Sequence, residues 1–150
     1  MPSSLTGPRI IALVSESTAT TATVTGTTQS LPVADSYLFI ADVGTATGTS
    51  PTLDIALQHS PDGGTHWYTF AKFAQITALG QRSLVFTPQV SLSQAASEQA
   101  IANTGSAVAF NQPIVYSSVR VLQTLGGTTP SFATINVWAI CSATSGSVLS

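Results

Sequence analysis

The residues most capable of chemistry gather at one turn, in the stretch LQHSPDGGTHW. His59, Asp62 and His66 fall within eight positions of one another, and histidine with aspartate can bind zinc or move protons. A zinc site needs three or four ligands held by further hydrogen bonds. The chain has only two histidines, and an aspartate in a turn usually accepts hydrogen bonds from the backbone that follows it. We therefore expect no metal, catalytic or cofactor-binding residues here.

The single cysteine gives no stronger indication of an enzyme. Cys141 ends the apolar stretch NVWAIC, so it has no partner for an internal disulfide and is expected to be a buried, reduced thiol. No motif links it to either histidine, and no set of nucleophile, base and orienting residue can be assembled. The sequence predicts a protein that is not an enzyme and has no cofactor.

Aromatic residues follow the turn and offer another kind of binding site. Trp67, Tyr68 and Phe70 could stack on a sugar ring. Aromatic side chains in strands more often fill the core, because each buries about 150–250 Å². A carbohydrate-binding β-sandwich module stays open as an alternative.

The elements that would position these residues are strands, since apolar and polar residues alternate along most of the chain. We predict one domain over residues 1–150, an antiparallel β-sandwich of jelly-roll type. Residues 1–30 are expected to form, in part, an extended arm that packs on neighbouring subunits, and Ser91–Gly105 is the one candidate helix. The predicted strands are Arg9–Val14, Ala22–Thr27, Tyr37–Val43, Thr52–His59, His66–Phe73, Ser83–Phe86, Ile114–Thr124 and Phe132–Cys141.

Two hairpins are predicted in more detail. In the first, Leu53, Ile55 and Leu57 share the buried face, and Pro61-Asp62-Gly63-Gly64 forms the turn. Its return strand is expected to place Trp67, Thr69, Ala71 and Phe73 on one face, opposite Tyr68, Phe70 and Lys72. In the second, Leu125–Pro130 forms the turn; Val115, Val119 and Val121 share a face opposite Arg120, which could pair with Asp54.

Charge is unusually scarce. Charged residues are 7% of the chain, with four cations, six anions and a net charge of −2, against a typical share of about 25%. So few cations exclude the basic surface of a nucleic-acid-binding protein and a polybasic membrane-binding patch. The 22 threonines and 20 serines supply a hydroxyl-rich surface instead. Lysine and glutamate are depleted where proteins meet, which favours a surface covered by neighbours over that of a merely uncharged secreted β-protein.

The two hairpins together, PTLDIALQHSPDGGTHW and YSSVRVLQTLGGTTPSFATINVWA, resemble a pattern in virion proteins of tailed bacteriophages. The resemblance covers about two-thirds of the chain, roughly Tyr37 to Ile140. It implies a structural virion protein, resembling capsid cement or decoration proteins, that bridges major capsid proteins at the capsid surface after assembly in the host bacterial cytoplasm. The implied partners are the major capsid protein and further copies of the chain in a dimer or trimer. A tail or head-completion protein is the alternative within this class. The turn is also similar to turns in discoidin-like sugar-binding modules, but no matching set of loop ligands is present.

Overall fold

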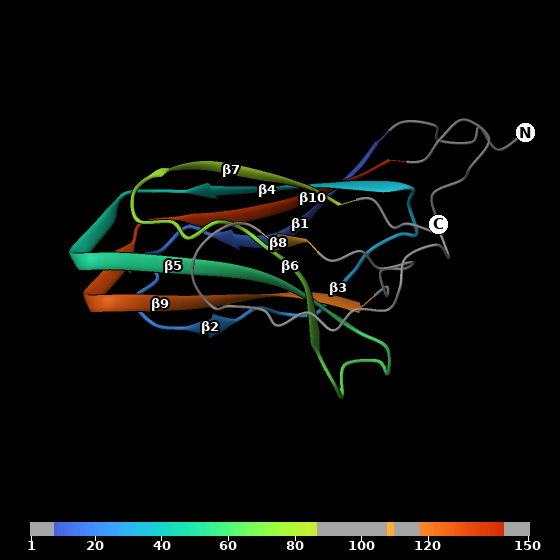
Figure 1. Cartoon of the computed structure of the whole chain (residues 1–150), viewed down its shortest axis with the longest axis horizontal. Helices are drawn as coiled ribbons and strands as arrows, with labels where there is room; N and C mark the ends of the chain where they lie inside the picture. The colour runs from blue at the N-terminus through green and yellow to red at the C-terminus, as the bar shows by residue number, and fades with distance from the viewer. Residues whose placement is uncertain (1–7, 87–107, 110–117, 143–150) are drawn as a thin grey trace, which may run out of the picture.

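The described part of the chain forms two antiparallel sheets packed face to face (Figure 1). The computed structural model describes residues 8–86, 108–109 and 118–142, and all regular elements within these ranges are strands. The predicted all-β sandwich is thereby confirmed. The candidate helix Ser91–Gly105 lies outside the described residues.

Sheet A, as we name the four-stranded sheet, is antiparallel throughout. Its central strands have apolar residues at nearly every position, which is the pattern of a strand covered on both faces. A bulge between Ala12 and Val14 shifts the register of the edge strand. In spatial order its strands are β1 (Arg9–Glu16), β10 (Ile135–Ser142), β4 (Ser36–Val43) and β7 (Gly80–Phe86).

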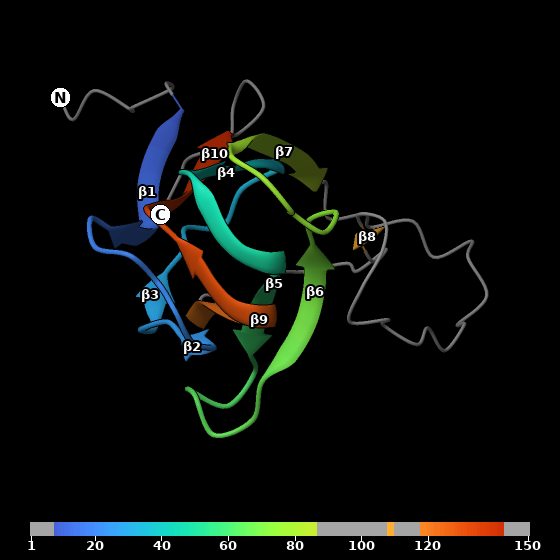
Figure 2. The ribbon, with the colours of Figure 1, turned by 90° about the vertical axis from the view of Figure 1, so that its left-hand side faces the viewer.

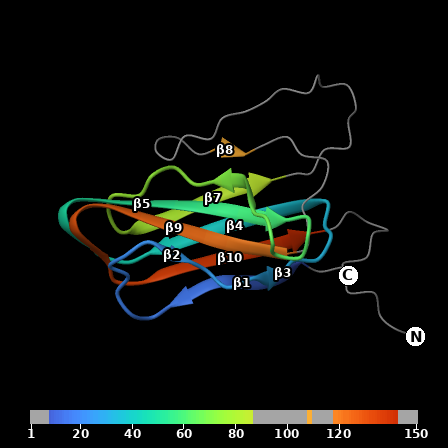
Figure 3. The same ribbon diagram turned by 90° about the horizontal axis from the view of Figure 1, so that it is seen from below.

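Sheet B, the six-stranded sheet, is built around its two longest strands, and seen from below they run across β4 and β10 of sheet A (Figure 3). Two short N-terminal strands pair with the same long strand, β9. The strands are β2 (Val24–Thr25), β3 (Gln29–Ser30), β9 (Ser118–Phe132), β5 (Ala46–Ser60), β6 (Tyr68–Lys72) and β8 (Val108–Ala109).

The core lies between the sheets, and the end view shows sheet A above sheet B (Figure 2). Leu53, Ile55 and Leu57 all face it, as the alternation in β5 predicts, and Val119 and Val121 face it from β9. The inward side of sheet A supplies Tyr37, Phe39, Ala41 and Val43 from β4, and Ile135, Val137, Ala139 and Cys141 from β10.

The return strand of the first hairpin departs from the predicted alternation. The register of β5 against β6 shifts between Leu57 and Gln58, which leaves Phe70 without a partner beside the pair Leu57–Ala71. Phe70 and Ala71 are both fully buried, and Lys72, in register with Ala56, is buried as well. A bulge places two consecutive residues opposite one and locally breaks the period of two. The prediction that Phe70 and Ala71 lie on opposite faces of a regular strand was therefore wrong.

The segment Leu125–Pro130 is also not a turn. It lies within β9, which runs on to Phe132, and the connection to β10 comes at residues 133–134. Its counterpart on β5 has nearly the same sequence: Gly48-Thr-Ser-Pro51 pairs with Gly127-Thr-Thr-Pro130, with Thr49 opposite Thr128.

These two matching segments form a double bulge. Gly48 and Gly127 have φ of 109° and 101°, and Ser50 and Thr129 have φ of 49° and 46°. A positive φ inside a paired strand marks a bulge, and the register of β5 against β9 shifts here twice. The positive φ that a turn requires is thus used to bend a continuous ribbon.

The N-terminal residues pair with the chain's own sheets. β1 forms an edge of sheet A along β10, and β2 and β3 lie beside β9. The described part of residues 1–30 is therefore integrated into the sandwich, and an arm that also reaches a neighbouring subunit stays a prediction.

Candidate functional site

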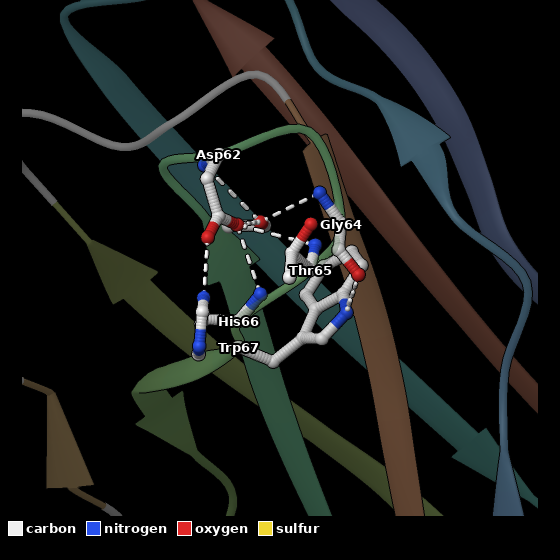
Figure 4. Close-up of polar contacts among 6 residues, drawn as sticks. Asp62, Gly64, Thr65, His66 and Trp67 are labelled. Carbon is white, nitrogen blue, oxygen red and sulfur yellow. Dashed lines mark hydrogen bonds and ion pairs between the residues drawn. The ribbon is translucent and has the colours of Figure 1, made fainter.

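Asp62 organises the turn between β5 and β6, as Figure 4 shows. Its Oδ1 accepts hydrogen bonds from the backbone N–H groups of Thr65 (3.1 Å) and His66 (2.8 Å) and from the hydroxyl of Ser60 (2.8 Å). Gly63 and Gly64 both have positive φ. The predicted turn chemistry is confirmed, with Asp62 satisfying the donors that the tight turn leaves unpaired.

Asp62 also contacts the His66 ring, with Oδ2 2.5 Å from Nδ1. The pKa of Asp62 is lowered well below its ordinary range, first by the backbone hydrogen bond from His66 and then by the contact with its side chain. Both side chains are exposed. The contact with His66 therefore favours the ionised form of the Asp62 carboxylate. It also links the two ends of the turn through their side chains.

His59 does not join this pair. It faces the core beside Phe70, with ring centroids 4.9 Å apart, and burial lowers the pKa of its imidazole. His66 is instead exposed at the far side of the turn. No group of three histidine, cysteine, aspartate or glutamate residues that could hold a metal occurs in the described ranges 8–86, 108–109 and 118–142.

Cys141 lies on the inward face of β10 and is fully buried. Burial raises the pKa of its thiol to about 11. Since the thiolate is the reactive form, a thiol held this way is a core residue and a poor nucleophile at neutral pH.

Trp67 packs against the guanidinium group of Arg120, so its ring is not fully exposed. Its Nε1–H donates to the backbone oxygen of Gly64 at 2.9 Å, and the guanidinium carbon of Arg120 lies 4.3 Å from the ring centroid. Arg120 Nε also donates to Gln58 Oε1 at 2.8 Å. The polar edge and one face of the indole are therefore occupied, which leaves less of Trp67 for a sugar ring.

The suggested pairing of Arg120 with Asp54 was wrong. Strand register places Arg120 opposite Gln58 and Asp54 opposite Thr124. Gln75 Nε2 donates to Asp54 Oδ2 at 3.0 Å instead.

A polar cluster at the edge of the core escaped the sequence analysis. Gln123 is fully buried and donates through Nε2 to Glu16 Oε1 at 3.2 Å, and Glu16 Oε2 accepts from the Thr20 hydroxyl. The alternation of β9 could have predicted the burial of Gln123, since it lies two and four positions from the buried Val121 and Val119 and faces the same side. These contacts attach the chain after β1 to sheet B, which is a structural role.

The outward face of sheet A carries the least expected feature of the molecule. Its strand register aligns outward side chains into rows, and two adjacent rows are almost wholly apolar. We call these eight residues the apolar patch: Ile10, Ile140, Leu38 and Val85 in one row, and Ala12, Trp138, Ile40 and Ser83 in the next.

The apolar patch is accessible within the single chain. Ile10 and Val85 on the edge strands are each 66% exposed, while Leu38, Ile40, Trp138 and Ile140 in the centre are partly exposed. Contiguous apolar surface of this kind marks interaction sites on soluble proteins.

Polar rows frame the apolar patch at both ends. Ser36 and Ser142 lie beyond one end with their Oγ atoms 2.7 Å apart. Ser15, Asn136, Asp42 and Gln81 lie beyond the other.

Among these framing residues, Asp42 alone is charged. Arg9 and Arg82 are in register with the inward-facing Cys141 and Ala41, so they do not belong to the outward rows. An apolar centre inside a polar rim with a single charge is the anatomy of a protein–protein interface.

Comparisons with protein-family models, with curated proteins and with solved structures find no match. Within the part of the chain that the structure describes, no helix is long and apolar enough to cross a membrane.

Proposed function

We propose that this protein is a structural virion protein, a capsid cement or decoration protein of a tailed bacteriophage. It stabilises the head by bridging major capsid proteins and acts as a symmetric oligomer at the capsid surface. The resemblance of its two hairpins to phage virion proteins supports the virion assignment.

The apolar patch is the observation that carries the assembly role. A strand surface with Leu38, Ile40, Trp138 and Ile140 outward is costly to leave in water, at about 25 cal/mol for each Å² of apolar area. A chain that acts by covering such a surface with polypeptide needs no catalytic set, and the residues most suited to chemistry serve the turn or the core.

The scarcity of charge predicts how these contacts respond to solution conditions. Interfaces built from apolar and hydroxyl groups have few ion pairs to screen, so binding to the shell should depend little on salt. Contacts of modest strength, repeated over many copies, would together stiffen the head against the pressure of packaged DNA.

Quantitative mass spectrometry of particles purified from cells that carry the gene tests the proposal. A cement protein is expected at a copy number comparable to that of the major capsid protein, in the hundreds for each particle. A dozen copies or fewer would instead indicate a tail or head-completion protein, and absence from the particles would overturn the virion assignment altogether.

Glycan titration tests the alternative of a carbohydrate-binding module. We expect isothermal titration calorimetry to show no glycan binding by wild type, and therefore no change in Trp67→Ala or Trp138→Ala. Binding that disappears with either variant would favour the binding module over the structural role.

A further inference from the structure

We propose that the apolar patch of sheet A is the contact surface for a second copy of this chain, packed face to face about a two-fold axis that runs across the strands. This inference rests on the proposed function, because it identifies the surface that forms the symmetric oligomer. Of the occupants that could cover the patch, a second copy is favoured because the patch is complementary to itself.

The register of sheet A defines where the axis lies. Ile11, Ala139, Phe39 and Leu84 form one row across all four strands, midway between the two apolar rows. A two-fold axis above this row places each strand opposite the same strand of the second copy, running the other way. Sheets packed this way stay about 10 Å apart with strands nearly aligned.

Apolar side chains face apolar ones on the central strands under this operation, and large side chains face small ones on the edge strands. On β10, Trp138 faces Ile140 of the second copy, and on β4, Leu38 faces Ile40. On the edge strands, each large side chain meets a small one: Ile10 faces Ala12, and Val85 faces Ser83. Alternation of large and small residues is what lets facing layers interdigitate without voids or clashes.

Charge placement favours the same axis. Asp42 comes to lie opposite the Ser36 hydroxyl of the second copy, which can donate a hydrogen bond to the carboxylate. The two Asp42 carboxylates fall at opposite ends of the patch, about 20 Å apart for a six-residue span of strand, beyond the screening length of about 8 Å. An axis parallel to the strands would bring both carboxylates to the same end.

The area suffices for a specific dimer. Four strands ~4.8 Å apart and four outward rows ~6.7 Å apart give a footprint of about 500 Å² on each copy. Two copies together reach about 1,000 Å², the size at which a specific interface becomes credible. A dimer of micromolar affinity is expected rather than an obligate one.

Analytical ultracentrifugation of the full chain from about 1 to 200 µM is the test, since this range spans a micromolar dissociation constant. The patch variant is Ile10→Asp with Val85→Asp, because these two side chains are the most exposed large apolar groups of the patch and a carboxylate at each would lose hydration in the dimer. It is expected to weaken dimerisation at least tenfold. The matched control is Val33→Asp with Leu79→Asp, whose side chains are similarly exposed, at 70% and 67%, but lie in loops outside the patch.

Trp138 fluorescence provides a second measurement of dimerisation, in a chain with no substitution in sheet A. The chain has two tryptophans, so Trp67→Phe leaves Trp138 as the sole reporter. Its emission should shift to shorter wavelength over the same concentration range as the dimer forms, because the indole leaves water.

Each other outcome overturns the inference. A wild-type chain that stays monomeric throughout, forms a closed ring of three or more, or dimerises despite the patch substitutions does not use this two-fold contact. A control that weakens dimerisation equally would show the effect to be unspecific. If the isolated chain is monomeric but is abundant in particles and the patch variant is absent from them, the capsid protein covers the patch, and the proposed function survives without the dimer.

Discussion

Replacing Gly127 with alanine should destabilise the protein far more than its place on an exposed strand surface suggests. Gly127 has φ of 101°, outside the region that residues with a Cβ occupy readily. A Cβ added there would overlap the carbonyl oxygen of Ser50 and lie 2.9 Å from that of Thr49. Both obstacles are backbone atoms of the paired strand, so no side chain can turn aside.

The magnitude follows from two separate costs. Holding a non-glycine residue at this φ costs about 1–3 kcal/mol. Separating β5 from β9 to admit the methyl group adds about 1–3 kcal/mol, as other overpacked sites do. A total of about 2–6 kcal/mol is a large share of the roughly 5–15 kcal/mol that stabilises a typical domain. The midpoint of thermal unfolding should fall by roughly 4–24 °C.

Gly63→Ala is the matched control. Gly63 also has positive φ, at 73°, but a Cβ there meets nothing within 4 Å. This variant should lose only about 1–2 kcal/mol. Urea denaturation followed by tryptophan fluorescence and circular dichroism measures both. Equal losses in the two variants would refute the close backbone approach as the cause.

Three further predictions concern buried or turn groups. Tyr37→Phe removes a hydroxyl that donates to the backbone oxygen of Pro32 at 2.8 Å, so urea unfolding should show a loss of about 1–3 kcal/mol; an unchanged midpoint would contradict this. Burial raises the pKa of the Cys141 thiol to about 11, so a thiol reagent at about pH 8 should react only as the protein unfolds, and rapid labelling of the folded chain would count against it. The pKa of Asp62 is lowered on folding from an ordinary value of 3.8, so its ionised form stabilises the fold above that pH. The stability advantage of wild type over Asp62→Asn should stay constant above about pH 5 and shrink below about pH 4; a constant difference down to about pH 2 would contradict the linkage.

The sandwich could be predicted from sequence because alternation is a local signal. Leu53, Ile55 and Leu57 repeat every second residue, and their buried face follows directly. The turn at Asp62 was equally local, since its hydrogen bonds reach only four residues along the chain.

The double bulge could not be predicted this way. Gly127 followed by Thr-Thr-Pro carries the residues of a turn, and positive φ serves a turn and a bulge alike. What distinguishes them is the matching Gly48 on β5, whose own Cβ would lie 2.5 Å from the Thr129 oxygen. That contact joins residues about eighty positions apart and is invisible to a local pattern.

The sequence pattern of β10 indicated the apolar patch, but only ambiguously. β10 is apolar at both parities for most of its length, with Trp138 and Ile140 between Val137, Ala139 and Cys141. Such a run indicates two covered faces, but only the neighbouring strands decide which face meets the core and which is left outward.

The double bulge also constrains how β5 and β9 can come together. A slip of one residue would turn Leu53 and its inward neighbours toward solvent, and a strand pair fifteen residues long offers many such errors. The two Gly-Thr-Ser/Thr-Pro segments fit only when Thr49 meets Thr128, because each glycine lies against two specific backbone carbonyls of the other strand. The two segments thus favour a single register of β5 against β9 and disfavour shifted pairings during folding.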